Sequence, residues 1–112
     1  MRAVDEPAEG TFVENRTWQL RRGEELIGGL TLEVIDMFWY DCRFEPSASW
    51  PTLRPFAEAS RDAWQRRDME AAVKADEAMH ALGLELVPDD GSEPITRFVL
   101  RVSGNVARFK WY

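Results

Sequence analysis

The chain has 112 residues, of which 45% are hydrophobic and 12% aromatic, and its formal net charge is −6. This length suits one domain with one core, and the apolar content excludes a chain that is disordered throughout. The negative charge argues against general binding of duplex DNA or RNA, which depends on Lys and Arg neutralising phosphates.

Three features of the sequence predict a cytoplasmic location and no membrane partner. No apolar run approaches the roughly 20 residues of a membrane helix. The first ten residues are acidic and lack the apolar segment of a secretion signal. The lone cysteine, Cys42, cannot form an internal disulfide, which fits a reducing compartment.

The chain begins with a segment that shows no periodicity. Residues 1–15 are rich in acids and predict a loose N-terminal arm, so that a single domain would span residues 16–112. From Thr17 onward, apolar and polar residues alternate as in a strand. Gly23-Glu24 lies between two such extended runs, which predicts a tight hairpin turn with Gly supplying the positive φ.

The second extended run divides into two faces at period two. The expected core face carries Leu26, Gly28, Leu30, Leu32 and Val34, and the other face carries Ile27, Gly29, Thr31, Glu33 and Ile35. Gly28-Gly29 interrupts the strand and predicts a bulge or a point of close packing. A one-residue slip there would reverse the two faces beyond it.

The next strand is the sequence DMFWYDCRFEPS, residues 36–47, which contains aromatics, the cysteine and several charges. Period two assigns Phe38, Tyr40, Cys42 and Phe44 to the core, and Met37, Trp39, Asp41, Arg43 and Glu45 to the opposite face. Pro46 is expected to end the strand because proline supplies no ladder N–H.

Residues 51–83 have helical periodicity. Pro51 suits a first helical turn, and Gly83 suits the position after a last turn. The apolar stripe is interrupted at Arg67-Asp68, and Asp is a competent N-cap. We therefore expect two helices, or one sharply kinked helix, rather than a straight helix of about 32 residues, which would be unusually long.

The remaining chain predicts three more strands. Leu84–Val87 is followed by a turn-rich loop, and alternation over residues 95–102 and 107–111 flanks a hairpin at Ser103–Asn105. The order of elements is then β-β-β-α(α)-β-β-β. It predicts an α+β domain with a single, mainly antiparallel sheet and helices packed on one face.

Several elements carry a resemblance to known proteins: TWQLRRGEELIGGLTL, CRFEP, LRPF, ALGLELVPDDG and the C-terminal strand FKWY. In their order and spacing, over roughly residues 17–112, the chain resembles a group of small actinobacterial (Streptomyces-type) proteins with no assigned activity. The resemblance implies a cytosolic bacterial α+β protein and carries no catalytic residues.

The residues that could carry chemistry favour structural roles. Cys42 and His80, the sole Cys and His, could form a nucleophile–base pair, but Cys42 falls on the core face and His80 in a last helical turn, where the helix dipole favours it. The acidic loop of residues 89–93 lacks the ligand spacing of a calcium loop. One Cys and one His make no zinc set, so we expect no metal and no cofactor.

The face opposite the helices is the candidate binding surface. It is expected to carry Arg21, Arg43, Arg97, Arg101, Arg108 and Lys110 against Glu33, Asp41 and Glu45, among large apolar groups such as Trp39 and Tyr112. Arg and aromatic residues on an open sheet face are typical of a protein interface. An ordinary solvated face with cross-strand ion pairs is the competing interpretation.

These patterns predict a non-enzymatic interaction module that binds an acidic protein partner or a second copy of itself. The candidate binding residues are Trp39, Asp41, Arg43, Glu45, Arg97, Arg101 and Tyr112. A small-molecule binder or small enzyme that uses Asp41, Arg43 and Glu45 in a sheet-face pocket is the alternative. Stacking of a single-stranded nucleic acid on Trp39 and Tyr112 is a weaker third possibility.

Overall fold

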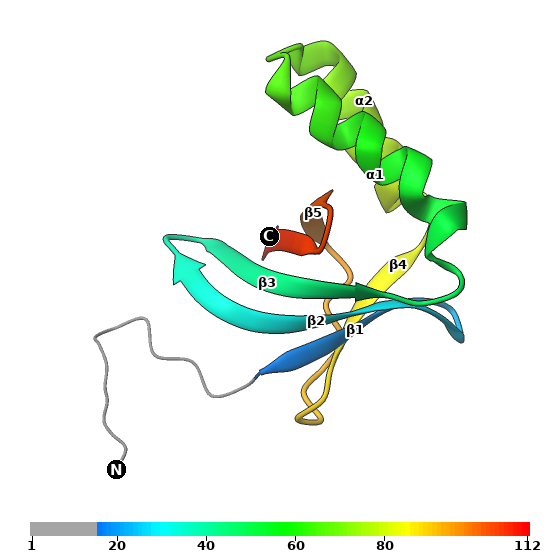
Figure 1. Ribbon diagram of the computed structural model, residues 1–112, viewed down its shortest axis with the longest axis vertical. Coiled ribbons are helices and arrows are strands. Elements are labelled where there is room, and N and C mark those ends of the chain that lie inside the picture. The colour runs from blue at the N-terminus through cyan, green and yellow to red at the C-terminus, as the bar shows by residue number, and fades with distance from the viewer. Residues whose placement is uncertain (1–15) are drawn as a thin grey trace.

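The computed structural model describes residues 16–112, and the arm expected over residues 1–15 lies outside the described residues (Figure 1). The described chain contains six strands and two helices. The strands are β1 (Thr17–Arg22), β2 (Glu25–Asp36), β3 (Trp39–Pro46), β4 (Leu84–Pro88), β5 (Phe98–Ser103) and β6 (Val106–Trp111). The helices are α1 (Trp50–Gln65) and α2 (Met69–His80). This order confirms the predicted α+β class.

The strands form one antiparallel sheet in the order β4-β1-β2-β3-β6-β5. The sheet is curled into a half-barrel, and both helices lie on the same side of it (Figure 1). An isolated bridge between Leu86 and Ile95 links β4 to the segment that leads into β5, through backbone hydrogen bonds of 2.8 and 2.9 Å. The two edges of the sheet are therefore drawn toward each other.

The break between the helices is where the sequence predicts it. Asp68 caps α2, its side chain accepting a hydrogen bond of 3.2 Å from the backbone N–H of Ala71. Arg67, one residue earlier, has a φ of 59°, a left-handed conformation that α-helix cannot contain. The chain therefore reverses at Arg67, and α2 packs back against α1.

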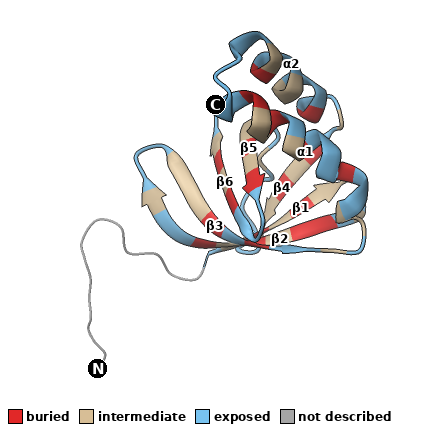
Figure 2. Ribbon diagram, turned by 45° about the horizontal axis from the view of Figure 1, so that its top comes forward, coloured by how far each residue is buried: buried red, intermediate tan, exposed pale blue. Residues whose placement is uncertain are grey.

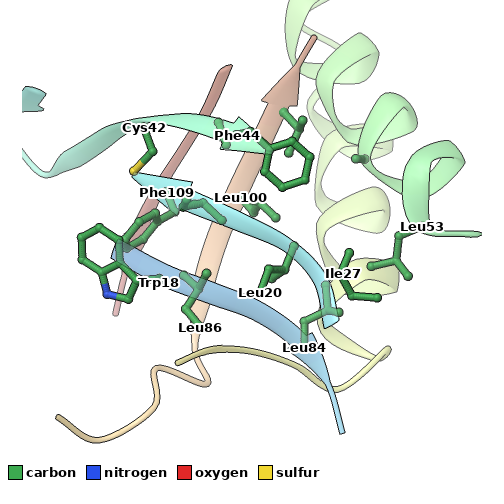
Figure 3. Packing of buried hydrophobic residues seen from close by; sticks show 14 of the residues in the cluster. Trp18, Leu20, Ile27, Cys42, Phe44, Leu53, Leu84, Leu86, Leu100 and Phe109 are labelled. Atoms are coloured by element: carbon green, nitrogen blue, oxygen red, sulfur yellow. The ribbon is translucent and has the colours of Figure 1, made fainter. Parts of the chain in front are cut away.

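The core fills the concave side of the half-barrel (Figures 2 and 3). Trp18 is 1% exposed, and its ring lies edge-on to Phe109 at 5.1 Å between centroids. Phe44 is equally buried, and α1 contributes Leu53 to the same cluster (Figure 3). The alternation of β1 and β5 predicts which of their side chains belong to this core. On β6 it holds for Ala107 and Phe109, whereas Trp111, also expected inside, is 46% exposed.

The predicted faces of β2 are wrong at both ends of the strand. The register skips Ile27 between the pairs Leu20–Gly28 and Arg21–Leu26, and a second irregularity falls at Glu33. Each extra residue inverts the alternation, as expected of a bulge. Leu26 and Val34, predicted inside, are 40% and 45% exposed. Ile27, predicted outside, is buried, and Ile35, also predicted outside, is partly buried and packs against the core.

Gly28, next to the first bulge, is a point of close packing. A Cβ on Gly28 would lie 2.6 Å from Cε1 of Phe44, whereas a Cβ on Gly29 would meet no atom within 4 Å. Of the two alternatives predicted for Gly28-Gly29, close packing is confirmed at Gly28. The bulge lies one residue earlier, at Ile27. The ring of Phe44 occupies the space that a side chain at residue 28 would need.

The prediction that Phe38 belongs to the core is wrong, because β2 ends at Asp36 and β3 begins at Trp39. Met37 and Phe38 form the two-residue connection and are 82% and 76% exposed. Tyr40, Cys42 and Phe44 do point inward, as expected. The other tight turn, Gly23-Glu24, is confirmed, with a φ of 60° at Gly23.

Candidate functional site: a groove between α1 and the sheet

A groove of about 620 Å³ lies between the C-terminal half of α1 and the strands β3, β6 and β5. We call it the tryptophan groove. Its aromatic and aliphatic lining consists of Trp39, Trp64, Val99 and Val106. Its cationic lining consists of Arg61, Arg101, Arg108 and Lys110, and Gln65 and Ser103 complete it. Among residues 16–112, no carboxylate side chain lines the groove.

One wall of the groove is organised by Asp76 of α2. Its Oδ1 accepts hydrogen bonds from Ser60 Oγ at 2.8 Å and from Arg101 at 3.0 Å. Its Oδ2 accepts from Trp64 Nε1 at 3.2 Å and from Arg101 at 3.3 Å. The guanidinium carbon of Arg101 lies 4.6 Å from the centroid of the Trp64 ring. One carboxylate thus fixes both a guanidinium and the indole on which it stacks.

The buried position of Arg101 affects its acidity but not its charge. Loss of water around the guanidinium lowers the pKa of Arg101, and the neighbouring Asp76 carboxylate opposes that shift. An arginine remains protonated in proteins, so this wall is cationic at neutral pH.

The opposite wall is built around Trp39. Arg108 lies over its ring, 4.8 Å from the centroid, and the Lys110 ammonium lies 5.0 Å from it. Arg108 donates through Nε to Asp41 at 2.8 Å, and its other end lies 3.5 Å from Asp36. Two carboxylates outside the groove therefore hold Arg108 against the indole.

The cations of the groove differ in how far they are already neutralised. Arg61, Arg101 and Arg108 each pair with an aspartate. Lys110 lies within 4 Å of no carboxylate in the described part of the chain. Lys110 is therefore the side chain with charge to spare for an anionic group of a ligand.

The structure brings two of the predicted binding residues, Trp39 and Arg101, into this groove. Asp41 does not line the groove, but it accepts a hydrogen bond from Arg108, which does. Arg43 is exposed and lies 3.6 Å from Glu33, and Glu45 is exposed beyond it. The use of Asp41, Arg43 and Glu45 together as a ligand pocket stays a prediction.

Arg97 and Tyr112 lie at a different place from Trp39. Arg97 lies over the Tyr112 ring at 5.7 Å. Tyr112 lines a second cavity of about 280 Å³ between α2 and β5. The single predicted surface is thus divided between two hollows of the molecule.

The prediction that Arg101 lies on a helix-free face is wrong. Val99 and Leu100 point to opposite faces of β5, yet both line the second cavity against α2. The helices therefore pack over the β5 edge of the curled sheet, and Arg101 meets side chains of both helices. A flat sheet with the helices on one face would have kept Arg101 in the open.

Cys42 and His80 do not form a catalytic pair in this fold. The Cys42 thiol is 1% exposed and its sulfur lies 3.7 Å from the carbonyl oxygen of Tyr40. Burial, with the nearby carboxylates of Asp41 and Glu33, raises the pKa of Cys42 to about 12. His80 ends α2 and lines the second cavity, which Cys42 does not. A thiol that stays protonated at neutral pH is a poor nucleophile.

The acidic loop has a structural use, as its sequence predicts. Asp89 accepts a hydrogen bond from the Thr17 hydroxyl, and Asp90 accepts one from the backbone N–H of Ser92 at 2.9 Å. Hydrogen bonds from the Ser92 side chain and from its backbone N–H lower the pKa of Asp90. Among residues 16–112, no group of three or more His, Cys, Asp or Glu side chains is placed to hold a metal ion.

The groove residues that sequence reasoning missed are Arg61, Trp64, Gln65, Ser103 and Val106 as binding residues. Trp64 falls on the apolar stripe of α1, so its helical spacing assigns it to the core, but it is 37% exposed. Its indole N–H needs a polar partner, and the partner, Asp76, comes from another helix. The sequence signal that could have pointed to the groove is Trp64 itself, a tryptophan close to the predicted break between the helices.

No family model, curated protein or solved structure matches the chain. Over the described residues, neither helix has the length and apolar character required to cross a membrane.

Proposed function

We propose that this chain is a non-enzymatic interaction module that binds an acidic segment of a partner protein in the tryptophan groove. The observation that carries the proposal is the composition of the lining. Among residues 16–112 it has two indoles, four cationic side chains and no carboxylate, in a chain of net charge −6. Arg and Trp are the residues that most often dominate interface energies.

The side chains of the groove are held before any partner arrives. Asp76 fixes Arg101 and Trp64, and Asp41 with Asp36 fixes Arg108 against Trp39. Preorganised side chains lose little conformational freedom on binding, which favours affinity. Lys110, the groove cation that forms no ion pair within residues 16–112, supplies the main electrostatic attraction.

A protein partner fits this groove better than a nucleic acid. Base stacking requires an open aromatic face, and cationic groups already lie over the Trp39 ring. The net charge of −6 repels both kinds of anion, but it repels a nucleic acid, with one charge on every phosphate, more strongly than a short peptide with a few carboxylates. To bind an acidic peptide with an apolar side chain, the groove needs only the Lys110 ammonium for a carboxylate and the edge of an indole for the apolar side chain.

The direct test is a display selection with random peptides of about twelve residues, long enough in extended form to cross the groove. We expect the enriched peptides to combine two or more acidic residues with an aromatic or aliphatic one. Lys110→Glu should weaken the recovered peptides by about tenfold or more, since it replaces attraction by repulsion.

The chain offers a matched control, because Lys74 and Lys110 are its two lysines. Lys74 lies on α2, exposed and 3.9 Å from Glu70, and takes no part in the groove. Lys74→Glu changes the net charge by the same amount and should leave peptide binding within about twofold. Equal weakening by the two variants, or enrichment of basic peptides, contradicts the proposal.

A small-molecule ligand is the second candidate, because the groove is concave and within the usual range of ligand sites. It would use Trp39, Trp64 and Lys110 instead of the predicted trio of Asp41, Arg43 and Glu45. A screen of small aromatic carboxylates by thermal shift, with Lys110→Glu as control, tests this candidate separately. Binding of such acids without any peptide enrichment would favour it.

A further inference from the structure

The second cavity, which lies between α2 and β5, reaches from the surface of the molecule to its core. Its volume is about 280 Å³. Three of its lining residues belong to the hydrophobic core and are between 4% and 6% exposed: Met79, Leu84 and Leu100. Val73 and Tyr112 also line it and are 50% and 65% exposed. The cavity therefore has a buried apolar inner end and an open outer end.

Polar contacts hold α2 at the distance from β5 that leaves this cavity open. Asp76 of α2 accepts hydrogen bonds from Arg101 of β5 at 3.0 and 3.3 Å. The same carboxylate accepts one from Ser60 of α1 at 2.8 Å, so α2 is tied to both of its neighbours. Val73, one turn before Asp76, lines the cavity and stays half exposed. Closing the cavity by moving α2 inward would break the Asp76 contacts.

The size and lining of the second cavity suit an aromatic ring. Protein interiors pack as densely as organic crystals, and few of their voids exceed one water molecule. A cavity lined by apolar groups holds water poorly, and about 150 Å³ is enough to bind benzene. The second cavity has room for such a ring and a substituent. Met79, Phe98 and Tyr112 in its lining are side chains against which aromatic rings pack favourably.

The charged groups around the second cavity balance one another. Asp76, which lines it, pairs with Arg101. Glu77 also lines it, and Arg97 lies over the ring of Tyr112, another lining residue. Two carboxylates and two guanidinium groups leave no surplus charge to attract an ion. An ionic ligand would lose its water against the apolar inner end without gaining a countercharge, which is unfavourable. The cavity therefore selects a neutral ligand.

We infer that the second cavity is a binding site for a neutral aromatic molecule of one or two rings that carries one hydrogen-bonding group. The ring packs against Leu84 and Leu100 at the inner end. The polar group of the ligand meets the exposed outer end, where His80, Thr96 and Tyr112 offer an imidazole and two hydroxyls. A ligand of this size has a dissociation constant on the order of 0.1–1 mM.

Three matched probes test this inference, because benzyl alcohol, benzoate and benzylammonium share one ring and differ in charge. Each is added to the full chain, labelled with ¹³C in its Leu and Val methyl groups, while ¹H–¹³C correlation spectra are recorded. We expect benzyl alcohol to shift the methyl signals of Leu84 and Leu100 until they saturate, and to show nuclear Overhauser effects to both. Benzoate and benzylammonium should bind about tenfold more weakly or less.

A pair of substitutions in α2 tests the location of the site. Val73→Phe places a ring at the outer end of the cavity and should weaken benzyl alcohol binding about tenfold. The matched control is Met69→Phe, at a position of α2 that is 52% exposed and does not line the cavity. It should leave binding within about twofold. Both variants should fold, because each changes a side chain that is at least half exposed.

Several outcomes would overturn the inference. One is the absence of a saturable shift at Leu84 and Leu100 up to about 10 mM benzyl alcohol, well above the expected dissociation constant. Another is binding of either ion as tight as that of the alcohol. A third is binding that Val73→Phe leaves unchanged or that Met69→Phe weakens equally. None of these outcomes bears on the peptide site, because these four residues do not line the tryptophan groove.

Discussion

Replacement of Asp76 by alanine should lower the free energy of unfolding more than removal of any exposed ion pair of this fold does. The substitution leaves Ser60 Oγ, which is 0% exposed, without its partner. An orphaned buried hydroxyl costs about 1–2 kcal/mol. It also leaves Arg101, whose side chain is 15% exposed, without its countercharge. Breaking such a pair costs about 3–5 kcal/mol when both groups are fully buried, and about 2 kcal/mol when water reaches them in part.

The two contributions sum to about 3–4 kcal/mol. Loss of the Trp64 hydrogen bond adds little, because Trp64 is exposed and its Nε1 can bond to water instead. For a domain of this size the midpoint of thermal unfolding should fall by roughly 15 °C or more. Urea unfolding followed by tryptophan fluorescence gives the free energy of unfolding. The control is Glu58→Ala, which breaks an exposed α1 pair with Arg54 and should cost about 0.5 kcal/mol. A loss below about 1 kcal/mol for Asp76→Ala would refute the reasoning.

Three further predictions concern stability and reactivity. Gly28→Ala should destabilise by about 1–3 kcal/mol in urea unfolding because its Cβ meets Phe44, whereas Gly29→Ala should change stability by less than about 0.5 kcal/mol; equal effects would exclude the steric reason. Asp68→Ala should lower the free energy of unfolding by about 1 kcal/mol through loss of the α2 cap, and an unchanged thermal midpoint would contradict the cap. Burial raises the pKa of Cys42 from 9.0 to about 12, so the unfolded chain loses this proton first and stability should fall as pH rises from 9 to 12. Cys42→Ala should flatten that slope, and an identical slope in the variant would show that Cys42 does not cause it.

Local features of the sequence were sufficient for the elements of the fold. Asp68 as a cap predicts the second helix, and Gly23 predicts the first hairpin, because each acts on its immediate neighbours. The faces of β2 could not be derived in the same way. The bulges at Ile27 and Glu33 depend on pairing with β1 and β3, and each reverses the alternation that a single strand shows. Period two is reliable only while the register continues.

The candidate site was only half predictable for a related reason. Trp39 and Arg101 follow from strand alternation and the properties of Trp and Arg. Trp64 becomes a wall of the groove because the helices pack over the β5 edge, and that arrangement depends on the curl of the sheet. Asp76 then bonds to Arg101 and Trp64 across three elements. No local pattern contains that contact.

The five tryptophans of the chain allow the central claim to be tested within one spectrum. A ¹H–¹⁵N correlation spectrum, recorded while an acidic peptide from the display selection is added, reports each indole N–H separately. Binding in the tryptophan groove predicts that the Trp39 and Trp64 indole signals move and saturate together. The signal of Trp18, which is 1% exposed in the core, should stay in place. Saturable peptide binding that leaves both Trp39 and Trp64 unmoved would contradict the account.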